Sequence, residues 1–151
     1  MDPKETINDI LVNLFNEILK LEEEAIITDE FKDITNNDMH IIEAIGLSGE
    51  NTMSAVAKRL GITAGSLTTS VNGLVNKKYV TRHRSEEDRR VVFLRLTEKG
   101  VRAYEHHREY HRQMTEAVLD RLSEEELPVL VKALKDLAEF FRGYGSQIHE
   151  N

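Results

Sequence analysis

The chain of 151 residues contains no cysteine, which excludes disulfides, zinc sites built on cysteine, thiol nucleophiles and thiol-based peroxide sensors. Its only prolines are Pro3 and Pro128, so helices elsewhere are free of this helix breaker. No apolar run approaches the roughly 20 residues that a membrane span requires. The N-terminus is polar and lacks the pattern of a signal peptide. We therefore expect a cytoplasmic protein with no membrane partner.

Motifs of enzymes are also missing. The sequence has no phosphate-binding glycine loop and no nucleophile elbow. It has six histidines, but no constellation of partners accompanies them as a general acid or base would require. We therefore expect a binding protein rather than an enzyme.

Charge is distributed unevenly along the chain. The net charge is −7, yet residues 52–102 contain eleven Lys or Arg and four Asp or Glu, which gives this segment +7 and leaves −14 for the rest. A basic centre between acidic flanks marks a surface where a polyanion such as nucleic acid docks. The alternative is an ordinary fluctuation of surface charge.

Apolar periodicity predicts a mainly α fold with one small β-hairpin, an α+β class. Capping-box pairs support two of the helix starts, Thr35 with Asp38 and Ser123 with Glu126. We expect strands at 79–84 and 91–96, and helices at 3–27, 35–46, 52–61, 63–78, 97–122 and from 123 onward.

Two short helices between residues 52 and 78 have the pattern of a helix-turn-helix. Ala57 lies four residues before Gly61, a small residue for close helix crossing and a glycine for a left-handed turn. On the second helix, one side is apolar, and the other carries only small or uncharged groups that can reach base edges or phosphates. An ordinary polar surface is the alternative. This side comprises Gly65, Ser66, Thr69, Asn72, Gly73 and Asn76.

The tip of the hairpin carries Arg84, Arg89 and Arg90 beside Asp88. An extended tip that presents arginine fits a minor groove, where the negative potential is strongest. Asp88 is placed to orient an arginine through a bidentate pair. A solvated turn with local salt bridges is the alternative. A hairpin that follows a helix-turn-helix predicts a winged helix-turn-helix, here with long N- and C-terminal helices.

These motifs resemble those of the MarR family of transcriptional regulators. Asp88-Arg89-Arg90 and the following segment 94–100, LRLTEKG, are similar to the D-x-R wing and the L-T-x-x-G helix start of that family. The resemblance covers nearly the whole chain. Further segments resemble the branch of the family that represses fatty-acid-synthesis genes: 31–34, 39–40, 67–70 and 84–86.

The resemblance implies a single domain over 1–151, with a winged helix-turn-helix lobe at 35–100 and helical dimerisation regions at 1–30 and 101–146. It implies a homodimer on a pseudo-palindromic operator in double-stranded DNA, and nucleoid association when bound. Each recognition helix would enter a major groove, with Arg90 in the flanking minor groove and Asp88 as its orienter. The expected DNA contacts are Ser66, Thr68, Thr69, Asn72, Lys77, Arg82, Arg84, Asp88, Arg89 and Arg90.

The same resemblance implies that acyl carrier protein loaded with long acyl chains acts as co-repressor and that no further cofactor is required. A ligand of this family lies between the dimer helices and the DNA-binding lobe. Ordinary core packing is the alternative for the apolar residues expected to line such a pocket, which are Leu14, Ile18, Phe31, Met39, Ile42 and Met114.

The histidines indicate a second candidate effector of the regulator, a zinc ion. His107 and His111 are four residues apart and share a helix face. With His40 and one carboxylate of residues 22–24, taken as Glu24, they offer zinc four ligands. Zinc-sensing members of the family use a similar arrangement. The alternative is a polar network in which neutral histidines link the helices.

Overall fold

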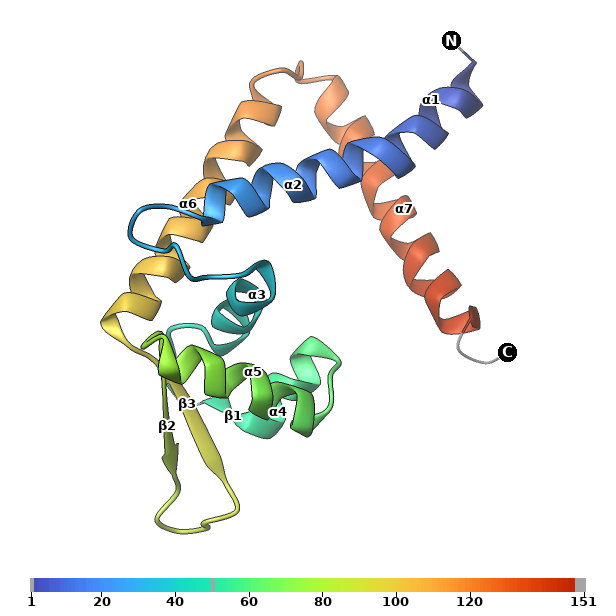
Figure 1. The fold of residues 1–151 in the computed structure, drawn as a ribbon. Helices are drawn as coiled ribbons and strands as arrows, with labels where there is room; N and C mark the ends of the chain where they lie inside the picture. Colours follow the sequence, from blue (N-terminus) through green and yellow to red (C-terminus); the bar gives the residue numbers. More distant parts are fainter. Residues whose placement is uncertain (1, 50, 149–151) are drawn as a thin grey trace. The chain divides into compact units, whose positions relative to one another are not determined.

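The computed structural model describes residues 2–49 and 51–148 (Figure 1). The predicted mainly α fold with a small β component is confirmed. The chain divides into two compact units, Met1–Tyr110 and His111–Asn151, with the boundary inside α6. In chain order the elements are α1 (Pro3–Asp9), the π-helical turn η1 (Ile10–Leu14), α2 (Phe15–Ile26), α3 (Asn36–Ile45), β1 (Asn51–Thr52), α4 (Met53–Leu60), α5 (Ala64–Asn76), β2 (Val80–Arg84), β3 (Val92–Leu96), α6 (Glu98–Leu119) and α7 (Glu126–Ile148).

The N-terminal helical segment differs in one respect from the single regular helix expected there. Its start is capped by Asp2, whose side chain accepts from the Lys4 N–H, with proline in the first turn. The π-helical turn η1 then separates α1 from α2. Inside this turn the Val12 carbonyl accepts from the Asn16 side chain at 2.7 Å. A single wide turn of this kind leaves the apolar periodicity readable, so the sequence pattern predicts the helix but not the turn.

Helices α4 and α5 form the predicted helix-turn-helix. Thr52 caps α4 by accepting from the Ala55 N–H, and Thr63 caps α5 by accepting from the Ser66 N–H. Between the helices Gly61 has φ of 64° in the left-handed region, which an L side chain rarely adopts. Ala57, four residues earlier, is buried in the core. The turn therefore forms as the sequence predicts, with a glycine in the left-handed turn and a small residue where the helices cross.

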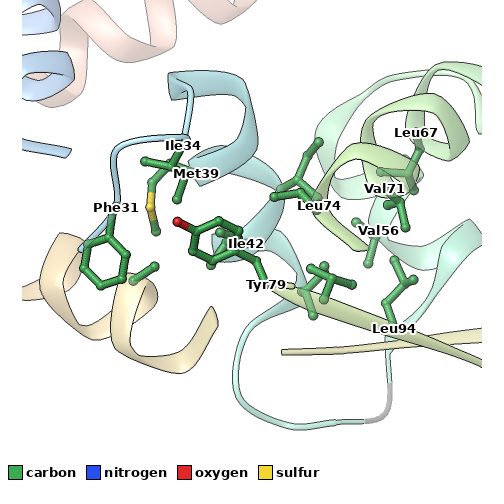
Figure 2. Close-up of a cluster of buried hydrophobic side chains, with 14 of the residues drawn as sticks. Phe31, Ile34, Met39, Ile42, Val56, Leu67, Val71, Leu74, Tyr79 and Leu94 are labelled. Carbon is green, nitrogen blue, oxygen red and sulfur yellow. The ribbon is translucent and has the colours of Figure 1, made fainter. Parts of the chain in front are cut away.

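The hydrophobic core of Met1–Tyr110 lies among α3, α4, α5 and the strands. Figure 2 shows the Tyr79 side chain between a group around Phe31 and Met39 and a second group around Leu67 and Leu94. Tyr79 has no exposed surface (0%). The Tyr79 and Phe31 ring centroids are 6.4 Å apart, and the residues of both groups belong to one hydrophobic core.

The described residues contain a three-stranded antiparallel sheet in the order β1-β3-β2. β2 and β3 form the predicted hairpin, with Val80 opposite Leu96 and Arg84 opposite Val92. β1 was not predicted, because two residues are too few to show an alternating pattern. Its Asn51 pairs with Leu94 and is buried, with the side-chain amide directed to Ser48 at 3.0 Å.

The start of α6 lies directly against the start of the wing. Thr97 caps the helix by accepting from the Gly100 N–H at 3.1 Å, and the Thr97 N–H donates to the Tyr79 carbonyl at 3.0 Å. A Cβ at Gly100 would lie 2.1 Å from the Tyr79 carbonyl oxygen. Glycine is therefore the residue that permits this approach of helix and strand.

Replacing Gly100 with alanine is expected to lower the free energy of unfolding by about 1–3 kcal/mol, because the backbone must shift to admit the methyl group. Gly73→Ala is the matched control, since a Cβ there meets nothing within 4 Å. The control is expected to leave stability unchanged or raise it by up to about 1 kcal/mol, as alanine favours a helix. Urea denaturation measures both, and equal stability of the two variants would contradict the packing described here.

Candidate nucleic-acid interface

Helix α5 separates its apolar and polar sides as predicted. Leu67, Val71 and Leu74 are completely buried in the core. The 13 residues of α5 include no Lys, Arg, Asp or Glu, so no long charged side chain holds the helix away from a groove floor. The polar residues exposed on this helix are Ser66, Thr68, Thr69, Asn72 and Asn76.

The exposed threonines use their hydroxyl protons within the helix. Thr68 Oγ1 donates to the Ala64 carbonyl at 2.8 Å, and Thr69 Oγ1 donates to the Gly65 carbonyl at 3.2 Å. Their remaining lone pairs point outward as hydrogen-bond acceptors. Both side chains therefore have a defined hydrogen-bonding polarity.

A groove of about 430 Å³ joins α5 to the hairpin. It brings together three of the predicted contact residues, Thr68 on α5 with Arg82 and Arg84 on β2. Met53 of α4 and Val92 of β3 complete part of its wall. Polar and cationic side chains of the helix and the hairpin thus line one groove.

The tip of the wing holds the predicted bidentate pair. Asp88 Oδ1 accepts from Arg90 Nε at 3.2 Å, and Asp88 Oδ2 accepts from Arg90 Nη2 at 3.4 Å. The Arg90 backbone N–H also donates to Asp88 Oδ1, at 3.0 Å. This backbone hydrogen bond, followed by that of the guanidinium, lowers the pKa of Asp88 below its ordinary value. Asp88 stays ionised and orients Arg90, whose side chain is 92% exposed.

Comparison with known proteins agrees with this geometry. The model of the MarR family matches residues 32–91. A crystal structure of Streptococcus pneumoniae FabT in complex with DNA is 42% identical, covers 93% of this chain and 98% of its own, and superposes with a TM-score of 0.85. The chain belongs to the MarR family.

Other MarR relatives are more distant. The uncharacterised HTH-type transcriptional regulator YpoP of Bacillus subtilis is 27% identical over 106 residues, which cover 70% of this chain and 75% of that protein. A complex of S. aureus MepR with DNA is 25% identical, covers 83% of this chain and 94% of its own, and has a TM-score of 0.64. This MarR protein is accordingly a DNA-binding transcriptional regulator and not an enzyme.

Lys77, at the end of α5, lies in an ion pair within the fold. Its Nζ is 2.8 Å from Asp38 Oδ2. The same Asp38 completes the capping box of α3 with Thr35, as predicted. Lys77 therefore ties the end of α5 to the start of α3, which the sequence did not indicate because the partners are 39 residues apart.

The other predicted contact residues lie at the surface. Arg82 donates to Asn72 Oδ1, and Arg84 Nη1 lies 3.5 Å from the Arg89 carbonyl. Arg89 itself is exposed at the wing tip. Arg82 and Arg84 therefore line the groove between α5 and the hairpin.

The apolar residues expected to line a ligand pocket have different environments. Phe31, Met39 and Ile42 are 0–4% exposed and belong to the core (Figure 2). Ile18 is half-buried and Leu14 is 42% exposed, both on the N-terminal helical segment. Met114 belongs to the second compact unit. The structure thus brings together three of these six residues, in ordinary core packing.

Of the predicted zinc ligands, His107 is buried and in contact with carboxylates. Its Nε2 lies 2.9 Å from Glu43 Oε1 and 3.3 Å from Glu22 Oε1. His40 and Glu24 are exposed, and His111 follows His107 by one turn of α6. Glu43 was missed by sequence reasoning, because it lies on α3, far from His107 along the chain. The sequence feature that could have indicated Glu43 was its position on α3, one residue after the buried Ile42.

Tyr79 and two charged side chains form a second group that sequence reasoning missed. The Tyr79 hydroxyl donates to Asp33 Oδ1 at 2.7 Å, and Lys99 Nζ lies 4.3 Å from the centre of the Tyr79 ring. The hydrogen bond from Tyr79, with a contribution from Lys99, lowers the pKa of Asp33. Burial and the Asp33 carboxylate raise the pKa of Tyr79, so its hydroxyl remains a donor.

The lowered pKa of Asp33 predicts a pH-dependent stability. The stabilisation is complete above about pH 4, the ordinary value of an aspartate, and is lost as the pH falls through the lower value of the folded protein. Asp33→Asn is expected to lower the free energy of unfolding at pH 7 by about 1 kcal/mol or less, because Asp33 is partly exposed. The difference should shrink as the pH falls below about 4. A difference that stays constant from pH 7 to pH 3 in urea denaturation would refute this account.

Proposed function

We propose that this MarR protein is a homodimeric repressor of fatty-acid-synthesis genes, with long-chain acyl groups on acyl carrier protein as co-repressor. It binds a pseudo-palindromic operator through α5 in the major groove and through Arg90 in the flanking minor groove. The likeness to FabT over nearly the full length of both chains is the observation that carries this proposal. The sequence resemblance to the branch that regulates fatty-acid synthesis supports it.

The interface geometry supports the DNA-binding mode. An uncharged helix face lies beside a hairpin whose arginines are exposed. Small polar groups suit base edges in the major groove, and an extended arginine suits the narrow minor groove. Phosphates would be met by the remaining cations of the basic central segment.

The dimer is proposed from exposed apolar surface at both ends of the chain. Large apolar patches on a folded protein mark interaction sites. A dimer also supplies two recognition helices, which must lie about 34 Å apart to read successive major grooves. The apolar residues with the highest exposed fractions on α7 are Val129, Leu134, Phe140, Phe141 and Tyr144, and those on the N-terminal segment are Ile7, Val12, Phe15, Leu19 and Leu21.

A zinc-responsive repressor is the second candidate, favoured by one observation. Buried His107 has two carboxylates within 3.3 Å of Nε2, and His111 follows it on the same helix. Histidine nitrogens and carboxylate oxygens suit zinc. The carboxylate ligand would then be Glu22 or Glu43 in place of Glu24, since these two lie within 3.3 Å of His107 Nε2.

Arg90→Ala is expected to weaken operator binding by about 1–3 kcal/mol, which is roughly 5- to 150-fold, because a groove arginine is lost. The dimer should persist, since Arg90 is on the wing. Fluorescence anisotropy with a labelled operator duplex measures the affinity, and size-exclusion chromatography measures the dimer.

Arg121→Ala is the control for Arg90→Ala. It removes the same charge from the segment that follows α6, outside the basic centre. This variant should bind as the unmodified protein does. Equal affinity of the two variants would count against the wing contact.

Carrier protein loaded with long acyl chains is expected to tighten operator binding by about 5- to 150-fold, the usual range of an allosteric coupling. Unacylated carrier protein is the control, and the same anisotropy titration reports both. Equal effects of the two forms would remove the acyl signal from the proposal. A purified protein that holds one zinc per chain, and loses operator affinity with a chelator, would favour the zinc candidate instead.

A further inference from the structure

Arg82 and Asn72 form a side-chain pair on the exposed surface between α5 and β2. Arg82 Nη1 donates to Asn72 Oδ1. Asn72 lies on the exposed side of α5, and Arg82 lies in the middle of β2, opposite Leu94 in the sheet. Both elements are anchored in the same core, through Val71 and Val80. The pair therefore rests on two elements whose relative position is fixed.

This hydrogen bond determines which end of the Asn72 amide faces outward. A guanidinium group has donors and no acceptor, so it can bond only the oxygen of an amide. Rotation of the Asn72 amide by 180° would place an N–H group against the Arg82 cation. The oxygen is therefore held at Arg82 and the nitrogen, Nδ2, is held away from it.

Nδ2 of Asn72 is left to donate to another molecule. Within residues 2–49 and 51–148, the side chain of Asn72 has Arg82 as its hydrogen-bond partner. Thr68 and Thr69 have instead used their hydroxyl protons on the Ala64 and Gly65 carbonyls and present acceptors. The middle of α5 thus presents a donor at Asn72 beside acceptors at the two threonines.

We infer that Arg82 is a positioning residue for specificity, which holds Asn72 so that α5 reads guanine or thymine in the major groove. This rests on the proposed entry of α5 into the major groove. Guanine offers O6 and N7, and thymine offers O4, to an amide N–H. Cytosine presents an amino group and no acceptor, and adenine presents an amino group beside its N7 acceptor. That amino group would meet another N–H or the Arg82 cation beside Oδ1, which repels it.

Selection from a randomised duplex library, followed by sequencing, tests the inference with four proteins. In each half-site, the unmodified protein is expected to prefer guanine or thymine at one position by about fivefold or more. Asn72→Ala should flatten the preference at that position. Asn72→Asp should reverse it to cytosine or adenine, because a carboxylate keeps the bond to Arg82 and offers only acceptors. Asn76→Ala, the control one turn later on α5, should leave this position unchanged.

Arg82 is tested by its own pair of variants. Arg82→Gln removes the cation and lets the Asn72 amide rotate, so the Asn72 position should also accept adenine or cytosine while the other positions keep their preferences. Arg82→Lys keeps a cation that only donates and should retain the preference. A mere phosphate contact would behave differently, since its loss weakens binding to all sequences alike and lowers the salt slope by about one.

Three results would overturn the inference. One is a preference for adenine or cytosine at the position that Asn72→Ala flattens. Another is a base preference that Asn72→Ala leaves intact everywhere, and the third is a uniform loss of affinity in Arg82→Gln with no change in preference. If the unmodified protein selects no sequence at all, the proposed sequence-specific repressor fails and the inference fails with it.

Discussion

The recognition helix and the wing are held relative to each other by Tyr79. Its backbone N–H donates to the Leu74 carbonyl of α5 at 2.9 Å, and its carbonyl accepts from Thr97 at the start of α6. Its side chain is buried, and its hydroxyl donates to Asp33. The preceding residue, Lys78, has φ of 68°, a left-handed conformation that costs a non-glycine residue roughly 1 kcal/mol. The chain thus turns sharply from α5 into β2, and the buried ring holds that turn.

This junction fixes α5 beside the hairpin. The helix contributes an uncharged face, and the hairpin contributes arginines whose guanidinium groups are oriented by Asn72 and Asp88. The orientation of Arg82 depends on the spacing between α5 and the hairpin. The orientation of Arg90 depends on the hairpin tip itself. In the basic centre, hydrogen bonds therefore orient the guanidinium groups of Arg82 and Arg90. Lys77 and Lys99 also contact the fold itself, at Asp38 and at the Tyr79 ring.

The parts that sequence predicted are those with local signals. Thr52 and Thr63 cap their helices, Gly61 adopts the left-handed turn, and Asp88 pairs with Arg90 two residues away. The pairs that the sequence did not reveal join distant positions. Tyr79 and Asp33 are 46 residues apart, and no periodicity or motif links such partners. The two-residue strand β1 and the π-helical turn were not predicted, because each is shorter than any recognisable sequence pattern.

Chemical footprinting on a duplex selected by the protein tests most directly whether α5 and the wing read DNA as one unit. Dimethyl sulfate methylates guanine N7 in the major groove and adenine N3 in the minor groove, so one reagent reports both grooves. The account predicts two blocks of protected N7 positions, centred about 10 base pairs apart or a multiple of that, each flanked by protected N3 positions. Protection of a single block, or protected N7 positions without flanking N3 protection, would contradict it.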